Sequence, residues 1–260
     1  MEILVCIKRV PDTAENEIEL NSTGNDLNRE DLVYSINDWD NYAVEEAIQI
    51  VDRVGGNVTV VTLGDEESKE VLRRELAMGA NNALFLSDDA FGRLDGRGVA
   101  TVLEKVVKKG NYDLILTGVQ ADDGASQIGG MLAAMLDYPY ASVVNSIAIK
   151  EDKVLEISRE TEGGNLEISQ INMPCVLSIQ TGINEPRYVG IRGIRKVASV
   201  EIPTLTTDDL GLDTLALKPR TTRLDYFVPE LGESAEMLQG STEEIITTLI
   251  GMLKAKGGLK

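Results

Sequence analysis

The chain has 260 residues, of which 43% are hydrophobic and 26% are charged, a composition typical of a globular protein with a sizeable core. Its formal net charge of −18 at pH 7 would repel nucleic acid from most of the surface, so a nucleic-acid-binding protein is disfavoured. The sequence contains no histidine, the commonest proton shuttle and metal ligand. We therefore expect no catalytic residues and no metal site of its own, and we expect any redox chemistry to come from a cofactor or a partner.

The N-terminal stretch MEILVCIKRVPDT has no basic start and no small-residue cleavage site, so it is not typical of a secretory signal. No apolar stretch approaches the roughly twenty residues that span a bilayer. Cys6 and Cys175 each lie in an apolar, strand-like run, which predicts buried thiols rather than a disulfide or a metal site. We expect a soluble, cytoplasmic protein without direct membrane insertion.

The first elements are a strand, a polar loop and a helix. Residues 2–8 form a continuous apolar run that predicts a buried strand, and the turn-rich residues 21–35 predict a loop or hairpin. From Asn37 onward, apolar residues recur every three or four positions, which predicts a helix capped by Asn37 or Asp38. Gly55-Gly56 ends this helix.

Strands and helices then alternate. Residues 57–64, 83–87 and 112–118 read as aliphatic strands, whereas residues 67–78 and 99–106 have helical periodicity. Uninterrupted aliphatic strands that alternate with helices are typical of a parallel sheet covered on both faces. The predicted fold class is therefore α/β, with a mostly parallel sheet of the adenine-nucleotide-binding type.

The rhythm changes after Pro139. The alternating segments KVLEIS and NLEISQI flank TEGG and predict an antiparallel hairpin added to the sheet. Beyond Pro203 the chain becomes polar until a last helix, which Ser241 and Glu244 would start as a capping box. We expect an α/β domain over residues 1–202 and an extended C-terminal arm with its helix over residues 203–260, lying across the domain or a partner.

The stretch LILTGVQADDGASQIGGMLAAMLDYP begins as a strand and ends as a helix. Residues 118–129, here named the phosphate loop, would lie beyond the carboxyl edge of the sheet, where open parallel sheets bind ligands. Amides of a glycine-rich turn and of a helix start bind anions. Asp122 and Asp123 would then accept bonds from loop N–H groups or a ribose, leaving Ser126 and Gln127 for the phosphate. Without a Walker or dinucleotide fingerprint, a capped junction that binds nothing is an equal alternative.

Together with VCIKRVPDT, INDWDNYAVEEA, LAMGAN and TGINEPRYVGIRGIRK, the loop makes the chain resemble the beta (small) subunit of electron-transfer flavoprotein over almost its whole length. The resemblance implies a heterodimer whose alpha subunit carries most of the redox FAD site. It also implies a second adenine nucleotide in this subunit. That nucleotide is AMP in the housekeeping branch and a second, NADH-reducible FAD in the electron-bifurcating branch.

The resemblance assigns the nucleotide site to four segments that follow strands or precede helices. They are Cys6; Asn37, Asp38, Trp39 and Asp40; Thr62, Leu63 and Gly64; and Gly118, Gln120, Ala121, Asp122, Asp123, Gly124, Ser126, Gln127 and Gly129. The phosphate loop is one residue shorter than is usual in the family. Thr13, which replaces an aromatic residue of some members, and Trp39 would lie near the FAD of the alpha subunit, although Trp39 also fits a half-buried core position.

The stretch GINEPRY, residues 182–188, follows an apolar strand and is named the recognition loop. Pro186 restricts Glu185 to an extended or turn conformation, which predicts Ile183 at an exposed tip. The resemblance implies that Ile183 anchors a partner dehydrogenase, with Asn184, Arg187 and Tyr188 beside it; alternatively, Ile183 packs inward. Two further surface features are Glu160, which matches a family glutamate that meets the mobile flavin domain, and a basic patch. The patch consists of Arg192, Arg195 and Lys196 and would meet the alpha subunit or an acidic dehydrogenase surface.

The resemblance implies an electron carrier in fatty acid oxidation that accepts electrons from acyl-CoA dehydrogenases and passes them to a membrane-linked or other acceptor. In this role the chain binds AMP structurally and helps form the FAD site of the alpha subunit, with the C-terminal arm packed on that subunit. The bifurcating form with a second FAD is one alternative. A stand-alone nucleotide sensor of the universal-stress type is another, but it leaves GINEPRY and the C-terminal arm unexplained.

Overall fold

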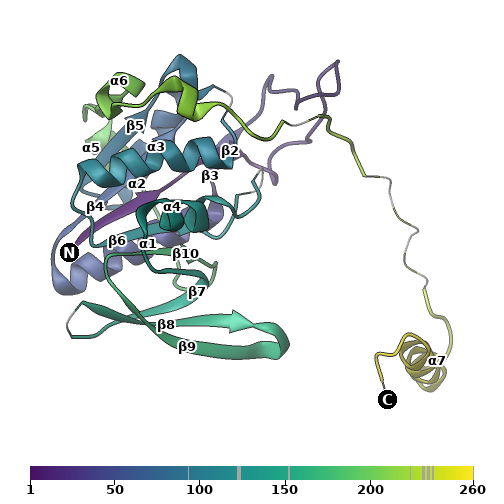
Figure 1. Ribbon diagram of the computed structural model, residues 1–260. Helices are drawn as coiled ribbons and strands as arrows, with labels where there is room; N and C mark the ends of the chain where they lie inside the picture. Colours follow the sequence, from purple (N-terminus) through teal and green to yellow (C-terminus); the bar gives the residue numbers. More distant parts are fainter. Residues whose placement is uncertain are drawn as a thin grey trace. The chain divides into compact units, whose positions relative to one another are not determined.

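A computed structural model of the chain describes residues 1–92, 94–121, 124–151, 153–222, 224–229, 232, 235 and 237–259. The chain divides into two compact units, Met1–Leu224 and Asp225–Lys260. The first unit contains the sheet, and the second contains helix α7 (Thr242–Ala255) (Figure 1). No described helix is both long and apolar enough to cross a membrane.

The first unit is built on a nine-stranded sheet, as far as the described residues extend. From β11 to β7 all neighbouring strands are parallel, whereas β8 and β9 continue the sheet as an antiparallel hairpin. In spatial order the strands are β11 (Thr204–Leu205), β5 (Asn82–Leu86), β4 (Asn57–Leu63), β1 (Glu2–Cys6), β6 (Leu114–Gly118), β10 (Cys175–Ile179), β7 (Tyr140–Ile149), β8 (Val154–Thr161) and β9 (Asn165–Asn172). The predicted α/β class with its antiparallel addition is confirmed.

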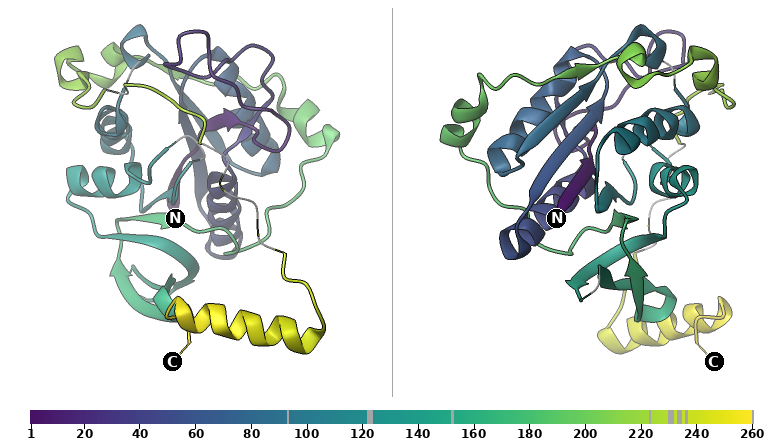
Figure 2. Two further views of the ribbon diagram at one scale, coloured as in Figure 1. Left: turned by 90° about the vertical axis from the view of Figure 1, so that its right-hand side faces the viewer. Right: turned by 60° about the vertical axis from the view of Figure 1, so that its left-hand side comes forward.

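Helices cover both faces of the parallel part of the sheet (Figure 2). Successive side chains of a strand point to opposite faces, so Ile3 and Val5 pack with the helices on one face and Leu4 packs with those on the other. All three are fully buried, which explains the uninterrupted apolar run at the start of the chain. The first face carries α1 (Asp38–Val54) and α2 (Lys69–Met78), and the second carries α3 (Gly96–Lys109) and α4 (Ile128–Leu136).

Shorter elements complete the two units. A small antiparallel pair forms between β2 (Arg9–Pro11) and β3 (Tyr34–Ile36), which bracket the predicted polar loop. Helix α5 (Ile191–Val197) packs against α2. The remaining short helices are η1 (Glu66–Ser68), η2 (Asp89–Phe91), η3 (Glu162–Gly164), α6 (Thr207–Leu210) and η4 (Thr214–Leu217).

The strand order reverses at β1, and the carboxyl ends of β1 and β6 are here named the switch point. The chain proceeds from β1 to β4 and β5 on one side and then returns to form β6 on the other side of β1. Connections that leave in opposite directions leave a crevice at the carboxyl ends of these strands, which is where doubly wound sheets bind ligands. The topology therefore directs attention to the ends of β1 and β6.

The C-terminal segment is divided between the two units. Thr204–Leu205 pairs with β5 and Leu210 and Leu217 join the core, so the chain leaves the first unit only after Leu224. In the second unit, α7 begins with the predicted capping box of Ser241 and Glu244. It exposes Ile246, Leu249, Ile250 and Leu253. Packing of the arm on a partner stays a prediction.

Glu75 of α2 is an unusual member of the core. Its side chain is fully buried, and neither carboxylate oxygen has a hydrogen-bond partner among the described residues. Burial raises the pKa of Glu75 to about 8, partly offset by Arg74, because an ionised carboxylate loses its hydration there. Glu75 is therefore protonated at neutral pH in the folded chain.

We predict that Glu75→Gln makes the protein more stable toward high pH. Folded Glu75 keeps its proton up to a pKa of about 8, whereas an unfolded glutamate releases it near 4.5. The stabilising contribution is complete below pH 4.5 and is lost as the pH rises through 8. Since one pKa unit corresponds to about 1.4 kcal/mol, the loss should exceed that value. Thermal unfolding of wild type and variant between pH 5 and 9 measures it.

Glu70→Gln is the matched control, because Glu70 lies on the same helix but is exposed. It should leave the pH dependence of the unfolding temperature as in the wild type. Parallel pH profiles for wild type and Glu75→Gln would contradict the prediction.

Candidate functional site

Asp40 joins the two strand ends at which the sheet order reverses. Its Oδ2 accepts a hydrogen bond from the backbone N–H of Lys8 at 2.9 Å, and its Oδ1 accepts one from the N–H of Gly118 at 2.9 Å. Lys8 follows β1 and Gly118 ends β6. Burial raises the pKa of Asp40 to about 7, with partial offset from Asn37 and the two backbone donors. Asp40 therefore uses both oxygens to hold the protein's own backbone.

Asn37 connects the start of α1 to the phosphate loop. Its backbone N–H donates to the Lys8 carbonyl at 2.9 Å, and its Nδ2 donates to the Gln120 carbonyl at 2.8 Å. The side chain is fully buried, and its Oδ1 has no partner among the described residues. Because an unpaired buried acceptor is costly, this oxygen is suited to receive a donor from a ligand.

Glycine is required at both ends of the phosphate loop. A Cβ on Gly118 would lie 2.6 Å from the Cβ of Trp39, and one on Gly129 would lie 2.2 Å from the Ser178 Oγ. The loop can therefore pack directly against α1 at one end and against β10 at the other. Ser178 belongs to a buried hydroxyl cluster in which its Oγ lies 2.8 Å from the Thr117 Oγ1 and 3.1 Å from the Tyr140 hydroxyl.

Between these glycines the loop presents polar groups at the carboxyl edge of the sheet. Gln120, Gly124, Ser126 and Gln127 are exposed, and Ser126 adopts a left-handed φ of 47°. Helix α4 begins directly afterwards, so its first amides face the same edge. These donors suit a phosphate. Asp122 and Asp123, to which the sequence assigns a role, lie outside the described residues.

The end of β4 supplies the third predicted segment of the site. Thr62 is buried, and its Oγ1 has no partner among the described residues, whereas Leu63 and Gly64 are half-buried. Cys6 ends the neighbouring β1, where burial and the negative charge of Asp40 raise the pKa of its thiol to about 12. The Cys6 thiol is therefore protonated at neutral pH, and Cys6 contributes to the site only as the last residue of β1. The buried Cys175 thiol has its pKa raised to about 12 in the same way.

Trp39 lies between the phosphate loop and the end of β10. The Trp39 Cβ lies so close to Gly118 that any side chain at position 118 would clash with it. The Trp39 indole Nε1 donates to the Gln180 Oε1 at 2.9 Å. It is half-buried, and Asp38 beside it is exposed. Thr13 is exposed in the turn after β2. The proximity of Trp39 and Thr13 to an FAD stays a prediction.

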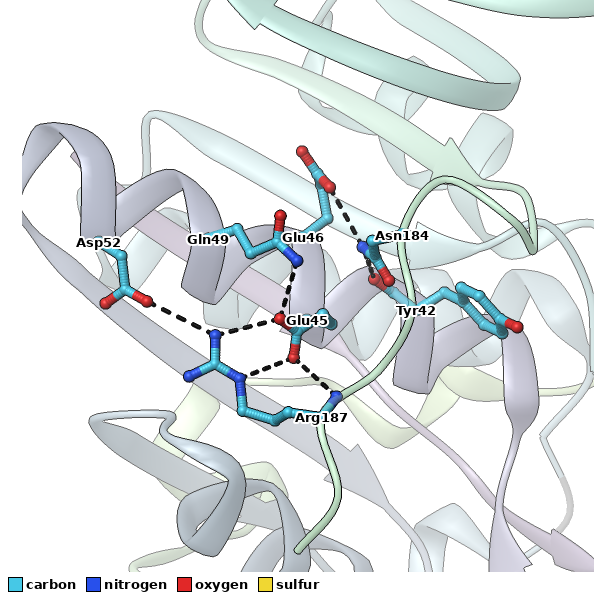
Figure 3. Close-up of polar contacts among 7 residues, drawn as sticks. All are labelled: Tyr42, Glu45, Glu46, Gln49, Asp52, Asn184 and Arg187. Atoms are coloured by element: carbon cyan, nitrogen blue, oxygen red, sulfur yellow. Dashed lines mark hydrogen bonds and ion pairs between the residues drawn. The ribbon is translucent and has the colours of Figure 1, made fainter.

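The recognition loop lies along α1 (Figure 3). The Arg187 Nε donates to the Glu45 Oε2 at 2.8 Å, and its Nη2 donates to the Glu45 Oε1 at 3.1 Å. The Asn184 Nδ2 donates to the Tyr42 carbonyl and to the Glu46 Oε2, each at 3.1 Å. The loop is therefore attached to the helix whose first turn contacts the phosphate loop.

The predicted exposed tip at Ile183 is wrong, whereas its role as an anchor for a partner dehydrogenase stays a prediction. Ile183 is half-buried and packs against the main core, as the alternative interpretation proposed. The exposed apolar side chain of the loop is Tyr188, at 91% exposure. The reason is that Asn184 and Arg187 bond residues of α1, so that Ile183 beside them also faces the core. These bonds, and not the backbone restriction that Pro186 imposes, decide the orientation of the Ile183 side chain.

Other predicted surface residues are accessible. Glu160 is exposed on β8 opposite Leu166 of β9. Arg192, Arg195 and Lys196 are exposed on α5, where they flank the exposed Ile191 and Ile194. Sequence reasoning missed three residues that organise the site: Gln180, which bonds Trp39; Glu45, which bonds Arg187; and Lys8, whose amide bonds Asp40. The only signal for them was their place directly after a strand or on the apolar side of a helix.

These features define a doubly wound α/β protein whose strand order reverses at β1, with buried polar groups gathered at the carboxyl ends of β1, β4 and β6. The family model described as "Electron transfer flavoprotein domain" matches residues 25–210. The chain belongs to the electron transfer flavoprotein family, as a beta subunit. This membership implies an alpha-subunit partner and association with flavin, and it excludes the stand-alone stress-type sensor.

Similar proteins match over nearly their whole length. The electron transfer flavoprotein subunit beta of Thermoanaerobacterium thermosaccharolyticum is 37% identical, with 98% of this chain and 99% of that protein covered. The beta subunit of Methylophilus methylotrophus is 35% identical, with 97% and 98% covered. Subunit CarD of the caffeyl-CoA reductase–Etf complex of Acetobacterium woodii is 36% identical, with 98% and 99% covered.

We predict that Asp40→Ala loosens the switch point. The change leaves the amides of Lys8 and Gly118 without their acceptor, and each unsatisfied buried donor costs about 1–3 kcal/mol. The free energy of unfolding should fall by about 2–4 kcal/mol, as measured by urea unfolding followed by circular dichroism.

The control is Asp38→Ala, two residues earlier and exposed, which should cost less than about 1 kcal/mol because it removes only a favourable charge at the helix start. Equal effects of the two substitutions would contradict the structural role given to Asp40.

Proposed function

We propose that this beta subunit binds AMP at the switch point and works with its alpha subunit to carry electrons from acyl-CoA dehydrogenases to a membrane-linked or other acceptor. The observation that carries the proposal lies at the ends of β1 and β6, which Asp40 joins: there the buried Asn37 Oδ1 and Thr62 Oγ1 have no hydrogen-bond partner among the described residues. Family membership supplies the electron-carrier role in its coarse form.

The groups around the crevice suit an adenylate. The exposed loop between Gly118 and Gly129 and the first amides of α4 offer donors to a phosphate. The unpaired Asn37 Oδ1 and Thr62 Oγ1 can bond hydroxyl or amino groups of the nucleoside. Asp40, whose pKa burial raises to about 7, already bonds the Lys8 and Gly118 amides with its two oxygens, which favours structural binding.

The redox step would belong to the FAD shared with the alpha subunit, which accepts and donates electrons when bound. The chain's own contribution is to shape that site, with Trp39 and Thr13 nearest to it. Both thiols have a pKa raised to about 12, the sequence has no histidine, and the two oxygens of Asp40 are bonded to the chain's own backbone. We therefore assign the redox step to the FAD and the shaping of its site to this chain.

Docking of the dehydrogenase would use the recognition loop and α5. Tyr188 is the exposed apolar contact, and Arg192 and Arg195 form a basic rim in a chain of net charge −18. An acidic partner surface would be repelled by most of the protein and attracted here. Glu160 and the C-terminal arm would face the alpha subunit.

We predict one flavin and one AMP in each purified heterodimer. The heterodimer is denatured, and the released flavin and adenylate are counted by absorbance and liquid chromatography. Two flavins without AMP would reject the AMP assignment in favour of the bifurcating alternative, whose second FAD is reducible by NADH.

We predict that Tyr188→Ala raises the KM of a purified bacterial acyl-CoA dehydrogenase for the flavoprotein about tenfold and leaves kcat within about twofold. Burial of one large apolar side chain contributes about 1.5–3 kcal/mol, and about 1.4 kcal/mol is tenfold in affinity. Leu215→Ala is the control, because Leu215 is 79% exposed on η4, away from the recognition loop in sequence. An unchanged KM for Tyr188→Ala would reject docking through this residue.

A further inference from the structure

The recognition loop has no secondary structure to hold it in place. Residues 180–190 form neither helix nor strand, and no backbone-to-backbone hydrogen bond in the described structure involves residues 181–189. Side chains accept from two amides of this region instead: Thr181 N–H, just before the loop, donates to the Gln180 Oε1 at 3.1 Å, and Arg187 N–H, within it, donates to the Glu45 Oε2 at 3.1 Å. Side-chain contacts therefore set the conformation of this loop.

These contacts attach the segment to α1 at three points. Gln180 bonds Trp39 in the first turn. Figure 3 shows the other two points: Asn184 bonds the Tyr42 carbonyl and Glu46, and Arg187 bonds Glu45 and reaches Asp52 at 3.5 Å. The attachment at Arg187 is the strongest in kind, because a planar guanidinium meets both oxygens of one carboxylate and the same carboxylate also accepts the loop amide.

Glu45 is held in place by its own helix as well as by the loop. Its side chain is only 4% exposed, and Gln49 donates to its Oε1 at 2.9 Å. Burial opposes ionisation, but the hydrogen bonds from Arg187 and Gln49 outweigh it and lower the pKa of Glu45 below its usual value. A buried carboxylate held in its charged form needs a cation, and Arg187 is the side chain that supplies it.

We propose that Arg187 is a positioning residue: by clamping the recognition loop to Glu45 on α1, it sets where Tyr188 stands relative to the switch point. The first turn of α1 bonds the phosphate loop through Asn37 and Asp40, so one helix carries both surfaces. The docking consequence rests on the proposed function, whereas the clamp itself does not.

The test uses the purified heterodimer and four forms of this chain: wild type, Arg187→Met, Arg187→Lys and the double variant Glu45→Gln/Arg187→Met. The double variant removes the buried charge that Arg187→Met would leave without a counterion, so a loss of the clamp is separated from a loss of stability. Arg29→Met is the matched control, because it removes an arginine that pairs with Asp26 at 3.1 Å in a different loop.

Hydrogen–deuterium exchange is read on peptides that cover residues 182–188 and on peptides of β1 and β4. Arg187→Met and the double variant should accelerate exchange of the amide at position 187, the hydrogen-bonded amide of the described loop, about tenfold and leave the strands unchanged, with Arg187→Lys between them and wild type. Arg29→Met should match wild type. Unchanged loop exchange, or equal acceleration in loop and strands, would overturn the proposal.

The second readout is reduction of the flavoprotein by a purified bacterial acyl-CoA dehydrogenase. Arg187→Met should raise KM about tenfold with kcat within about twofold, and Arg187→Lys should recover part of the loss. Faster loop exchange with an unchanged KM would overturn the positioning role. If the dehydrogenase fails to reduce even the wild type, the proposed electron donor is rejected, and the exchange comparison alone decides whether Arg187 is the clamp.

Discussion

The structure depends on one buried carboxylate that holds together two strand ends. Strands β1 and β6 are neighbours, but their following connections leave in opposite directions, so their last backbone amides have no ladder partner. Asp40 supplies that partner for Lys8 and for Gly118 at 2.9 Å each. Its two oxygens each accept from one of these amides, which is why a carboxylate is suited to this position even though burial raises its pKa to about 7.

The consequence of this constraint is that α1 becomes the frame of the functional surface. Its first turn holds the ends of two strands and the Gln120 carbonyl, and its next two turns hold the recognition loop through Glu45 and Glu46. Helices usually contribute to a site through their termini. Here a buried acidic face extends along the helix, and it has cations and amides from loops rather than solvent as partners.

Charge has two distinct roles in the molecule. The net charge of −18 keeps most of the surface unattractive to acidic partners and nucleic acid, and the exposed cations of α5 mark the exception. Inside, Glu45 is ionised because Arg187 compensates it, whereas Glu75 lacks a hydrogen-bond partner among the described residues and keeps its proton. The same residue type therefore stabilises the fold at one position and limits its stability at high pH at the other.

Periodicity and turn chemistry were sufficient to predict the α/β class, the β8–β9 hairpin and the capping box at Ser241, because these depend on contacts between residues near in sequence. Helix α1 does follow Asn37, but the Asn37 side chain bonds the Gln120 carbonyl instead of capping the helix. The family resemblance added the prediction that four segments, at the ends of strands and the starts of helices, form a nucleotide site. Which side chains bond across it could not be predicted: Gln180 with Trp39, Asp40 with Gly118 and Arg187 with Glu45 are each separated by more than seventy residues. The inward position of Ile183 has the same origin. Local chemistry decides which element each segment forms, but the partners of a buried charge are decided only when the packed sheet brings distant loops onto one helix.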